Sequence, residues 1–119
     1  MTLLATQIRS NHHNAKSMSD LEVTVEQSET AVVVHAAGSV DSNTAPQLQE
    51  PLLRAAENGA VQLDLAKVPY MSSAGLRVLL LAAKALQKRG ERLRVINAPA
   101  QIYNVLNISG FTSFIDVSS

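Results

Sequence analysis

The stretch that decides the fold runs from Val68 to Leu86 and reads Val-Pro-Tyr-Met-Ser-Ser-Ala-Gly-Leu-Arg-Val-Leu-Leu-Leu-Ala-Ala-Lys-Ala-Leu. It indicates the end of a strand, a tight turn with two adjacent serines, and a long helix. Pro69 lacks a backbone N–H and suits a strand exit. Ser72 or Ser73 can cap the helix by accepting from its unpaired amides. An exposed hydroxyl at that place would also lie at the positive end of the helix dipole, which favours a phosphate. The serines are therefore either caps alone or a modification site.

Working outward, apolar patterns predict strands at residues 21–26, 31–37, 61–65 and 92–96, with a last short strand within 110–117. The run 31–37 is almost wholly apolar, which is typical of a strand covered on both faces. Helices are expected from the Thr44 cap to Asn58, from the serines to Arg89, and from Pro99 to Asn107. Pro51 predicts a kink or break in the first helix. The order β-β-α-β-α-β-α-β predicts an α/β fold with a hairpin and parallel crossovers.

The loops that follow parallel strands meet at one edge of a sheet. We therefore expect residues 38–43, 67–73 and 97–99 to be neighbours. This places Asp41, Ser42 and Thr44 beside the two serines.

The long helix has three stripes on a helical wheel. The predicted core face holds Leu76, Leu79, Leu80, Ala83 and Leu86. A second apolar face holds Ala74, Val78, Leu81 and Ala85, and a basic stripe of Arg77, Lys84 and Lys88 lies between the two, on the side of Ser73. A helix that is apolar on two faces is either sandwiched within its domain or docks on a partner. We favour a partner surface, with Val78, Leu81 and Ala85 exposed in the unbound protein.

Composition excludes several classes of protein. The chain has 119 residues, enough for one domain, and its formal net charge is zero, which argues against a nucleic-acid-binding surface. It has no Cys, and no apolar run long enough to span a membrane. We find no cofactor motif, no metal-ligand pattern and no Asp that pairs recognisably with a His. His35 is expected to be a packed residue and Asp64 a solvent-facing one.

Residues 1–18 are expected to be a disordered leader before a domain at 19–119, and the lack of a signal peptide predicts a cytoplasmic protein.

Three segments together resemble the STAS domain of bacterial anti-sigma factor antagonists. They are Tyr70-Met-Ser-Ser-Ala-Gly-Leu-Arg77, Gly38-Ser-Val-Asp-Ser-Asn-Thr-Ala-Pro-Gln-Leu48 and, more weakly, Val95-Ile-Asn-Ala-Pro99. The resemblance implies a STAS fold whose helices pack mainly on one face of the sheet. It implies a binding module, without enzymatic activity or cofactor, that captures an anti-sigma factor that is also a serine kinase and so releases a sigma factor. Phosphorylation would end the capture, and a PP2C-type phosphatase would reset it.

Carried over by position, the phosphorylated serine of the family falls on Ser73, with Ser72 as the alternative. Ser72 stands where an Asp is common, and Ala74 where a Ser is common. The expected partner surface comprises Asp41, Ser42, Thr44, Met71, Ser72, Ala74, Arg77, Val78, Leu81, Lys84 and Ala85. The domain is expected to be a monomer or weak dimer.

Two alternatives remain open from the sequence. The first is a non-phosphorylated STAS subunit of a lipid-transport ABC system, which would dock on an ATP-binding subunit. The second is an enzyme with the Ser72 or Ser73 hydroxyl as nucleophile, which the lack of a plausible base disfavours.

Overall fold

The structure, a computed structural model, describes residues 21–119, so the expected leader at 1–18 lies outside the described residues. The strands are β1 (Glu22–Gln27), β2 (Val32–Ala37), β3 (Val61–Lys67), β4 (Leu93–Ile96) and β5 (Ile115–Val117). The helices are α1 (Ala45–Ala56), α2 (Ser73–Gln87) and α3 (Ala100–Ile108), followed by a 3-10 turn, η2 (Phe111–Ser113). Every predicted element is present in the predicted order.

The five strands form one sheet in the order β1-β2-β3-β4-β5. β1 pairs with β2 antiparallel, while β2 with β3, β3 with β4 and β4 with β5 are parallel. The predicted hairpin and parallel crossovers are therefore confirmed. Since each crossover returns the chain to the same end of the sheet, the loops after β2, β3 and β4 all lie along one edge.

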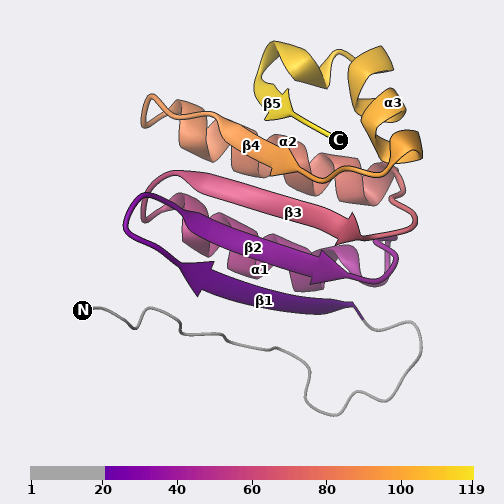
Figure 1. Cartoon of the computed structure of the whole chain (residues 1–119), viewed down its shortest axis with the longest axis horizontal. Coiled ribbons are helices and arrows are strands. Elements are labelled where there is room, and N and C mark those ends of the chain that lie inside the picture. Colours follow the sequence, from indigo (N-terminus) through magenta and orange to yellow (C-terminus); the bar gives the residue numbers. More distant parts are fainter. Residues whose placement is uncertain (1–20) are drawn as a thin grey trace.

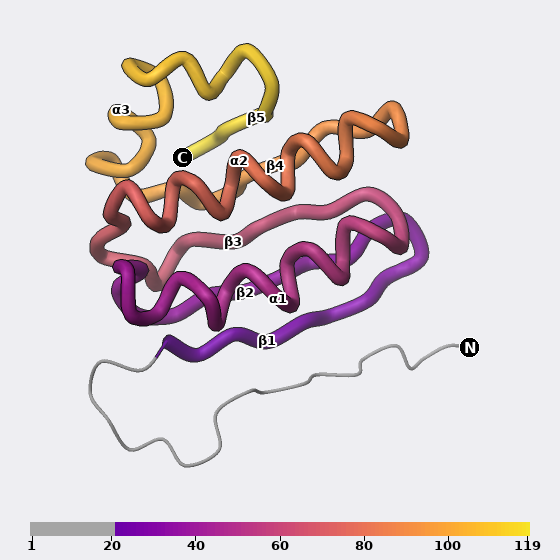
Figure 2. The backbone as a smooth tube through the Cα atoms, turned by 180° about the vertical axis from the view of Figure 1, so that it is seen from behind, coloured from indigo at the N-terminus to yellow at the C-terminus, as the bar shows by residue number. Residues whose placement is uncertain are grey.

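The helices α1 and α2 run side by side over the same face of the sheet, with α3 and η2 at the β4–β5 end (Figures 1 and 2). The core lies between this helical layer and the sheet, and it includes Val34, Leu48, Leu63, Leu79 and Leu86, all of them fully buried. Aliphatic residues supply this core almost alone, as the low aromatic content requires.

The prediction that β2 is covered on both faces is wrong. Val32, Val34 and Ala36 are buried, but Val33, His35 and Ala37 are only half-buried. The reason is that the helices described here cover one side of the sheet, so the other side of β2 remains open. A β-branched run is compatible with a half-buried strand because Val packs well on any pleated surface.

Of the predicted kink or break at Pro51, the break is wrong, because α1 continues through this residue from Ala45 to Ala56. An internal proline costs roughly 3 kcal/mol, since it removes one hydrogen bond and crowds the preceding turn. Leu48 and Leu52 lie on either side of Pro51 and are both fully buried. Each contributes about 1.5–3 kcal/mol through burial, which offsets the cost and holds both halves of the helix against the core.

Candidate functional site

The loops after β2 and β3 are joined by backbone hydrogen bonds. Val40 pairs with Met71 as a short parallel bridge. The Val40 amide donates to the Tyr70 carbonyl at 2.9 Å, and the Ser72 amide donates to the Val40 carbonyl at 2.8 Å. The predicted neighbourhood of these two loops is confirmed, and the start of α2 is fixed to the loop after β2.

Gly75, in the first turn of α2, allows this junction to close. A Cβ atom at that position would lie 2.5 Å from Cγ of Met71 and 2.8 Å from Cγ1 of Val40. Real Cβ atoms do not approach other atoms so closely, so a larger residue would force the helix away from the loops. The glycine therefore has a packing role that the sequence did not reveal.

The two serines have different environments. Ser72 is the N-cap of α2, is half-buried, and its hydroxyl accepts a hydrogen bond from the Ala74 amide at 3.2 Å. Ser73 is the first residue of the helix and is exposed. Among the hydrogen bonds of residues 21–119, none uses the Ser73 hydroxyl. The structure thus divides the serine pair into a cap and an available hydroxyl.

The side chains of Asp41 and Thr44 together organise the loop before α1. The Oδ1 atom of Asp41 accepts from the amides of Asn43 at 2.9 Å and Thr44 at 3.1 Å. The Thr44 side chain is buried, donates to the Ser39 carbonyl at 2.8 Å and makes no capping bond. The prediction that the Thr44 hydroxyl caps the helix is therefore wrong: the hydroxyl turns inward, and the amides of the first helical turn donate to the backbone carbonyls of Asp41 and Thr44. Asp41 is half-buried and Ser42 is exposed, so both residues of this loop are accessible to solvent.

The predicted faces of α2 need one correction. Val78 is buried in the core, at 2% exposure, whereas the sequence placed it on the outer face. Leu76 and Leu80, predicted for the core, are only half-buried. The buried arc is instead formed by Gly75, Val78, Leu79, Ala82, Ala83 and Leu86. Because α2 packs against α1 as well as the sheet, this arc is rotated from the one that the apolar residues alone suggest.

The outward side of α2 is a stripe that begins at Ser73. We call it the α2 stripe; its members, all exposed, are Ser73, Arg77, Leu81, Lys84 and Lys88. The exposure predicted for Leu81 is confirmed at 39%, while Ala85, like Ala74 and Met71, is half-buried. In the described part of the chain, no ion pair includes any cation of the stripe. The stripe therefore presents an apolar centre with unpaired positive charge around it.

The third predicted loop, residues 97–99, is held by β3 instead of by the serine turn. Asn97 has a positive φ of 57°, and its side-chain amide donates to Oδ1 of Asp64 at 3.1 Å. Burial of the Asp64 carboxylate works to raise its pKa, but hydrogen bonds from the Ala66 amide, Asn97 and His35 outweigh this and lower the pKa below the ordinary value of 3.8. The loop lies on the expected edge, yet none of the hydrogen bonds described here joins it to Ser73.

The comparisons with known proteins decide the family. The family described as "Mlab, STAS domain" matches residues 23–116. An anti-sigma-B factor antagonist of Bacillus subtilis (strain 168) is 35% identical over 101 residues, covering 84% of this chain and 93% of the relative.

This chain belongs to the STAS-domain family.

Solved structures agree with this assignment at the level of the fold. An anti-sigma factor antagonist from Mycobacterium paratuberculosis matches the STAS domain described here with a TM-score of 0.75 at 21% identity, covering 85% of this chain and 87% of that one. The phosphorylated form of SpoIIAA, a Bacillus cell fate determinant, matches with a TM-score of 0.65 at 18% identity, covering 82% and 91%. The predicted STAS fold and its mixed sheet are thereby confirmed.

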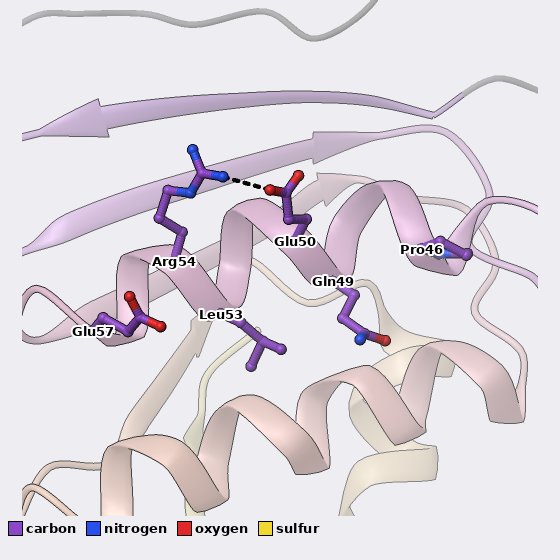
Figure 3. Close-up of a pocket in the computed structure, with 6 residues that line it drawn as sticks. All are labelled: Pro46, Gln49, Glu50, Leu53, Arg54 and Glu57. Carbon is purple, nitrogen blue, oxygen red and sulfur yellow. Dashed lines mark hydrogen bonds and ion pairs between the residues drawn. The ribbon is translucent and has the colours of Figure 1, made fainter.

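The STAS domain also has a shallow groove along α1. Its volume is about 390 Å³, and it is lined by Pro46, Gln49, Glu50, Leu53, Arg54 and Glu57. Gln49 and Leu53 point toward α2, whereas Glu50 and Arg54 point away from it and form an ion pair (Figure 3). These lining residues include no hydroxyl and no imidazole, and the carboxylate of Glu50 is paired with Arg54.

Two further structural findings bear on what the STAS domain can do. Within residues 21–119, no three His, Asp or Glu side chains are grouped so that they could hold a metal ion. None of the helices in this range has the length and apolar character needed to cross a bilayer.

Proposed function

We propose that this STAS domain is an anti-sigma factor antagonist that captures an anti-sigma factor acting as a serine kinase, and that phosphorylation of Ser73 ends the capture. The relatives named as anti-sigma-B factor antagonists support the binding role. The exposed hydroxyl of Ser73, which makes no hydrogen bond within residues 21–119, carries the proposed switch, because the hydroxyl of its neighbour Ser72 is occupied by capping.

The start of α2 can accept a phosphate without loss of the fold. Phosphorylation adds about 1.5–2 negative charges at neutral pH. The N-terminus of a helix carries partial positive charge and stabilises an anion there. Arg77 is exposed and lies one turn beyond Ser73, where a guanidinium can pair with a phosphate.

The same phosphate would oppose binding of the partner. The proposed contact surface is the α2 stripe together with the adjacent residues Asp41, Ser42, Met71, Ser72, Ala74 and Ala85. Leu81 would enter an apolar contact, and the cations beside it would pair with acidic groups. A phosphate at the edge of that contact requires costly desolvation and repels those acidic groups. Val78 and Thr44, which the sequence placed on the partner surface, are buried and lie outside the proposed contact surface.

The proposal places the protein in the cytoplasm, where the kinase has ATP, and assigns the reset to a PP2C-type phosphatase. A direct test mixes the full chain with an anti-sigma factor kinase encoded in the same genome and follows the complex by size-exclusion chromatography, before and after ATP is added. We expect a complex that dissociates with ATP, and one that persists with ATP when the chain is Ser73→Ala. A complex of Ser73→Ala that dissociates as fast as the wild-type complex contradicts the switch.

The lipid-transport alternative makes a different prediction for the same surface. A STAS subunit docked on an ATP-binding subunit would bind without being phosphorylated. Complex formation with a transport ATPase that is unchanged by ATP and by Ser73→Ala would favour this alternative.

A further inference from the structure

A chain of polar side chains crosses the open face of the sheet, on the side away from α1 and α2. Nε2 of His35 in β2 lies 3.0 Å from Oε1 of Glu26 in β1, and Nδ1 of His35 lies 2.9 Å from Oδ2 of Asp64 in β3. Asp64 continues the chain by accepting from Asn97, in the loop after β4, at 3.1 Å. Three neighbouring strands, and the loop after β4, are thus linked by side chains in addition to the backbone ladders of the sheet.

Both ring nitrogens of His35 face a carboxylate oxygen at hydrogen-bond distance. A neutral imidazole has one N–H and one lone pair, so it can donate to only one of two acceptors. The other contact would then set a nitrogen lone pair against a carboxylate oxygen. Only the doubly protonated ring donates to Glu26 and to Asp64 at the same time.

We propose that His35 is a proton-operated strap: the imidazolium ties β1 to β3 through Glu26 and Asp64, and loss of its proton releases Glu26 while the bond to Asp64 remains. The Glu26 side chain is 51% exposed and can turn into water, whereas that of Asp64 is 17% exposed. Asp64 is also held by the Ala66 amide and by Asn97. The neutral ring therefore keeps its proton on Nδ1.

Other charged groups near the strap are few. Thr24, the residue directly opposite His35 in β1, is uncharged. Two residues along β2, Ala37 lies opposite Glu22 in β1 and Lys67 in β3. On β4, Arg94 pairs in register with Gln62, two residues from Asp64. Within residues 21–119, the carboxylates of Glu26 and Asp64 are the charged groups in hydrogen-bond contact with the ring.

The strap acts on an edge strand, since β1 is outermost in the sheet described here. An edge strand is held by one ladder only, so a side-chain bond to β2 has more influence there than in the centre of the sheet. Loss of the second ring proton would thus loosen the hairpin while β3 and the Asn97 loop stay joined through Asp64.

A double-mutant cycle with Glu26→Ala and His35→Ala in the full chain tests the proposal. Urea unfolding is measured at about pH 5.5 and about pH 8.5, on either side of the ordinary imidazole pKa of about 6.5. At the lower pH we expect the coupling between Glu26 and His35 to raise the folding equilibrium constant about threefold. At the higher pH we expect this coupling to disappear. The matched control is the same cycle on Arg92 and Asp116, an ion pair with its atoms 3.0 Å apart, whose coupling should be equal at both pH values.

Nitrogen-15 NMR of the His35 ring provides a second readout that no folding defect can obscure. The His35 signals are assigned by their absence in His35→Gln. At the higher pH we expect the neutral tautomer with its proton on Nδ1. A neutral ring with its proton on Nε2 would overturn the proposal. So would a coupling energy from the double-mutant cycle that is equal at both pH values or absent at both.

Discussion

Gly75 lies so close to Val40 that a methyl group at its Cα would stand 2.8 Å from the Val40 Cγ1 atom. Because of this close contact, the first turn of α2 packs directly against the loop after β2, and Ser73 lies at the edge of the sheet. The position of the proposed phosphorylation site therefore depends on a residue without a side chain.

Gly75→Ala should destabilise the domain although alanine is the better helix former. Alanine gains at most about 1 kcal/mol in propensity. The new Cβ would also meet Met71 Cγ at 2.5 Å, and overpacking of this kind costs typically 1–3 kcal/mol. We expect a lower free energy of unfolding in urea, partly restored by adding Met71→Ala. A Gly75→Ala variant as stable as the wild type would show that the approach is not tight.

Asp41→Ala should lower stability by about 1 kcal/mol, because the Asn43 amide loses its acceptor and the Thr44 amide keeps only the Asp41 carbonyl. Asp41→Asn should restore most of this stability, since an amide oxygen still accepts. The Asn variant then isolates the charge: if Asp41 contacts the partner as proposed, Asn weakens binding while thermal unfolding is nearly unchanged. Equal binding by Asp41→Asn and wild type would confine Asp41 to its structural role.

Leu81→Glu should weaken partner binding at least tenfold, about 1.4 kcal/mol, while the fold survives. Leu81 is 39% exposed at the centre of the α2 stripe, so the charge enters the proposed contact without opening a cavity. Ile108→Glu is the matched control, since Ile108 is 81% exposed on α3 and should tolerate the same change without effect on binding. Unchanged binding by Leu81→Glu, unfolding of Leu81→Glu, or an equal loss of binding in Ile108→Glu would contradict this placement of the interface.

The sequence predicted the elements, their order and the meeting of the two main loops, because these depend on local periodicity and on the geometry of parallel crossovers. The predictions from the sequence were wrong where packing between distant segments determines which residues are buried or whether a helix continues. The inward turn of Val78 follows from the contact of α2 with α1, and the continuity of α1 through Pro51 follows from the burial of Leu48 and Leu52. The pairing of His35 with Asp64 could not be recognised in the sequence. It depends on the register of β2 against β3, across 29 residues of chain, and no local pattern reports such a register.

Acid should weaken the fold partly through Asp64, whose pKa is lowered by its hydrogen bonds. A carboxyl group with a lowered folded-state pKa stabilises the fold fully above its unfolded pKa, about 3.9. That contribution is lost as the pH falls through the folded-state value, which is below 3.8. Asp64→Asn should therefore flatten the fall in stability between about pH 5 and pH 2 in urea titrations. An unchanged slope would mean that Asp64 does not contribute to acid unfolding.

The central claim is that the Ser73 hydroxyl receives the phosphate while Ser72 remains a cap. The most direct measurement incubates the full chain with the anti-sigma factor kinase and ATP and maps the modified residue by fragmentation mass spectrometry. Ser72→Ala and Ser73→Ala are run beside the wild type. We predict phosphate on Ser73 in the wild type and in Ser72→Ala, and none in Ser73→Ala. Phosphate solely on Ser72, or on neither serine, would contradict the account.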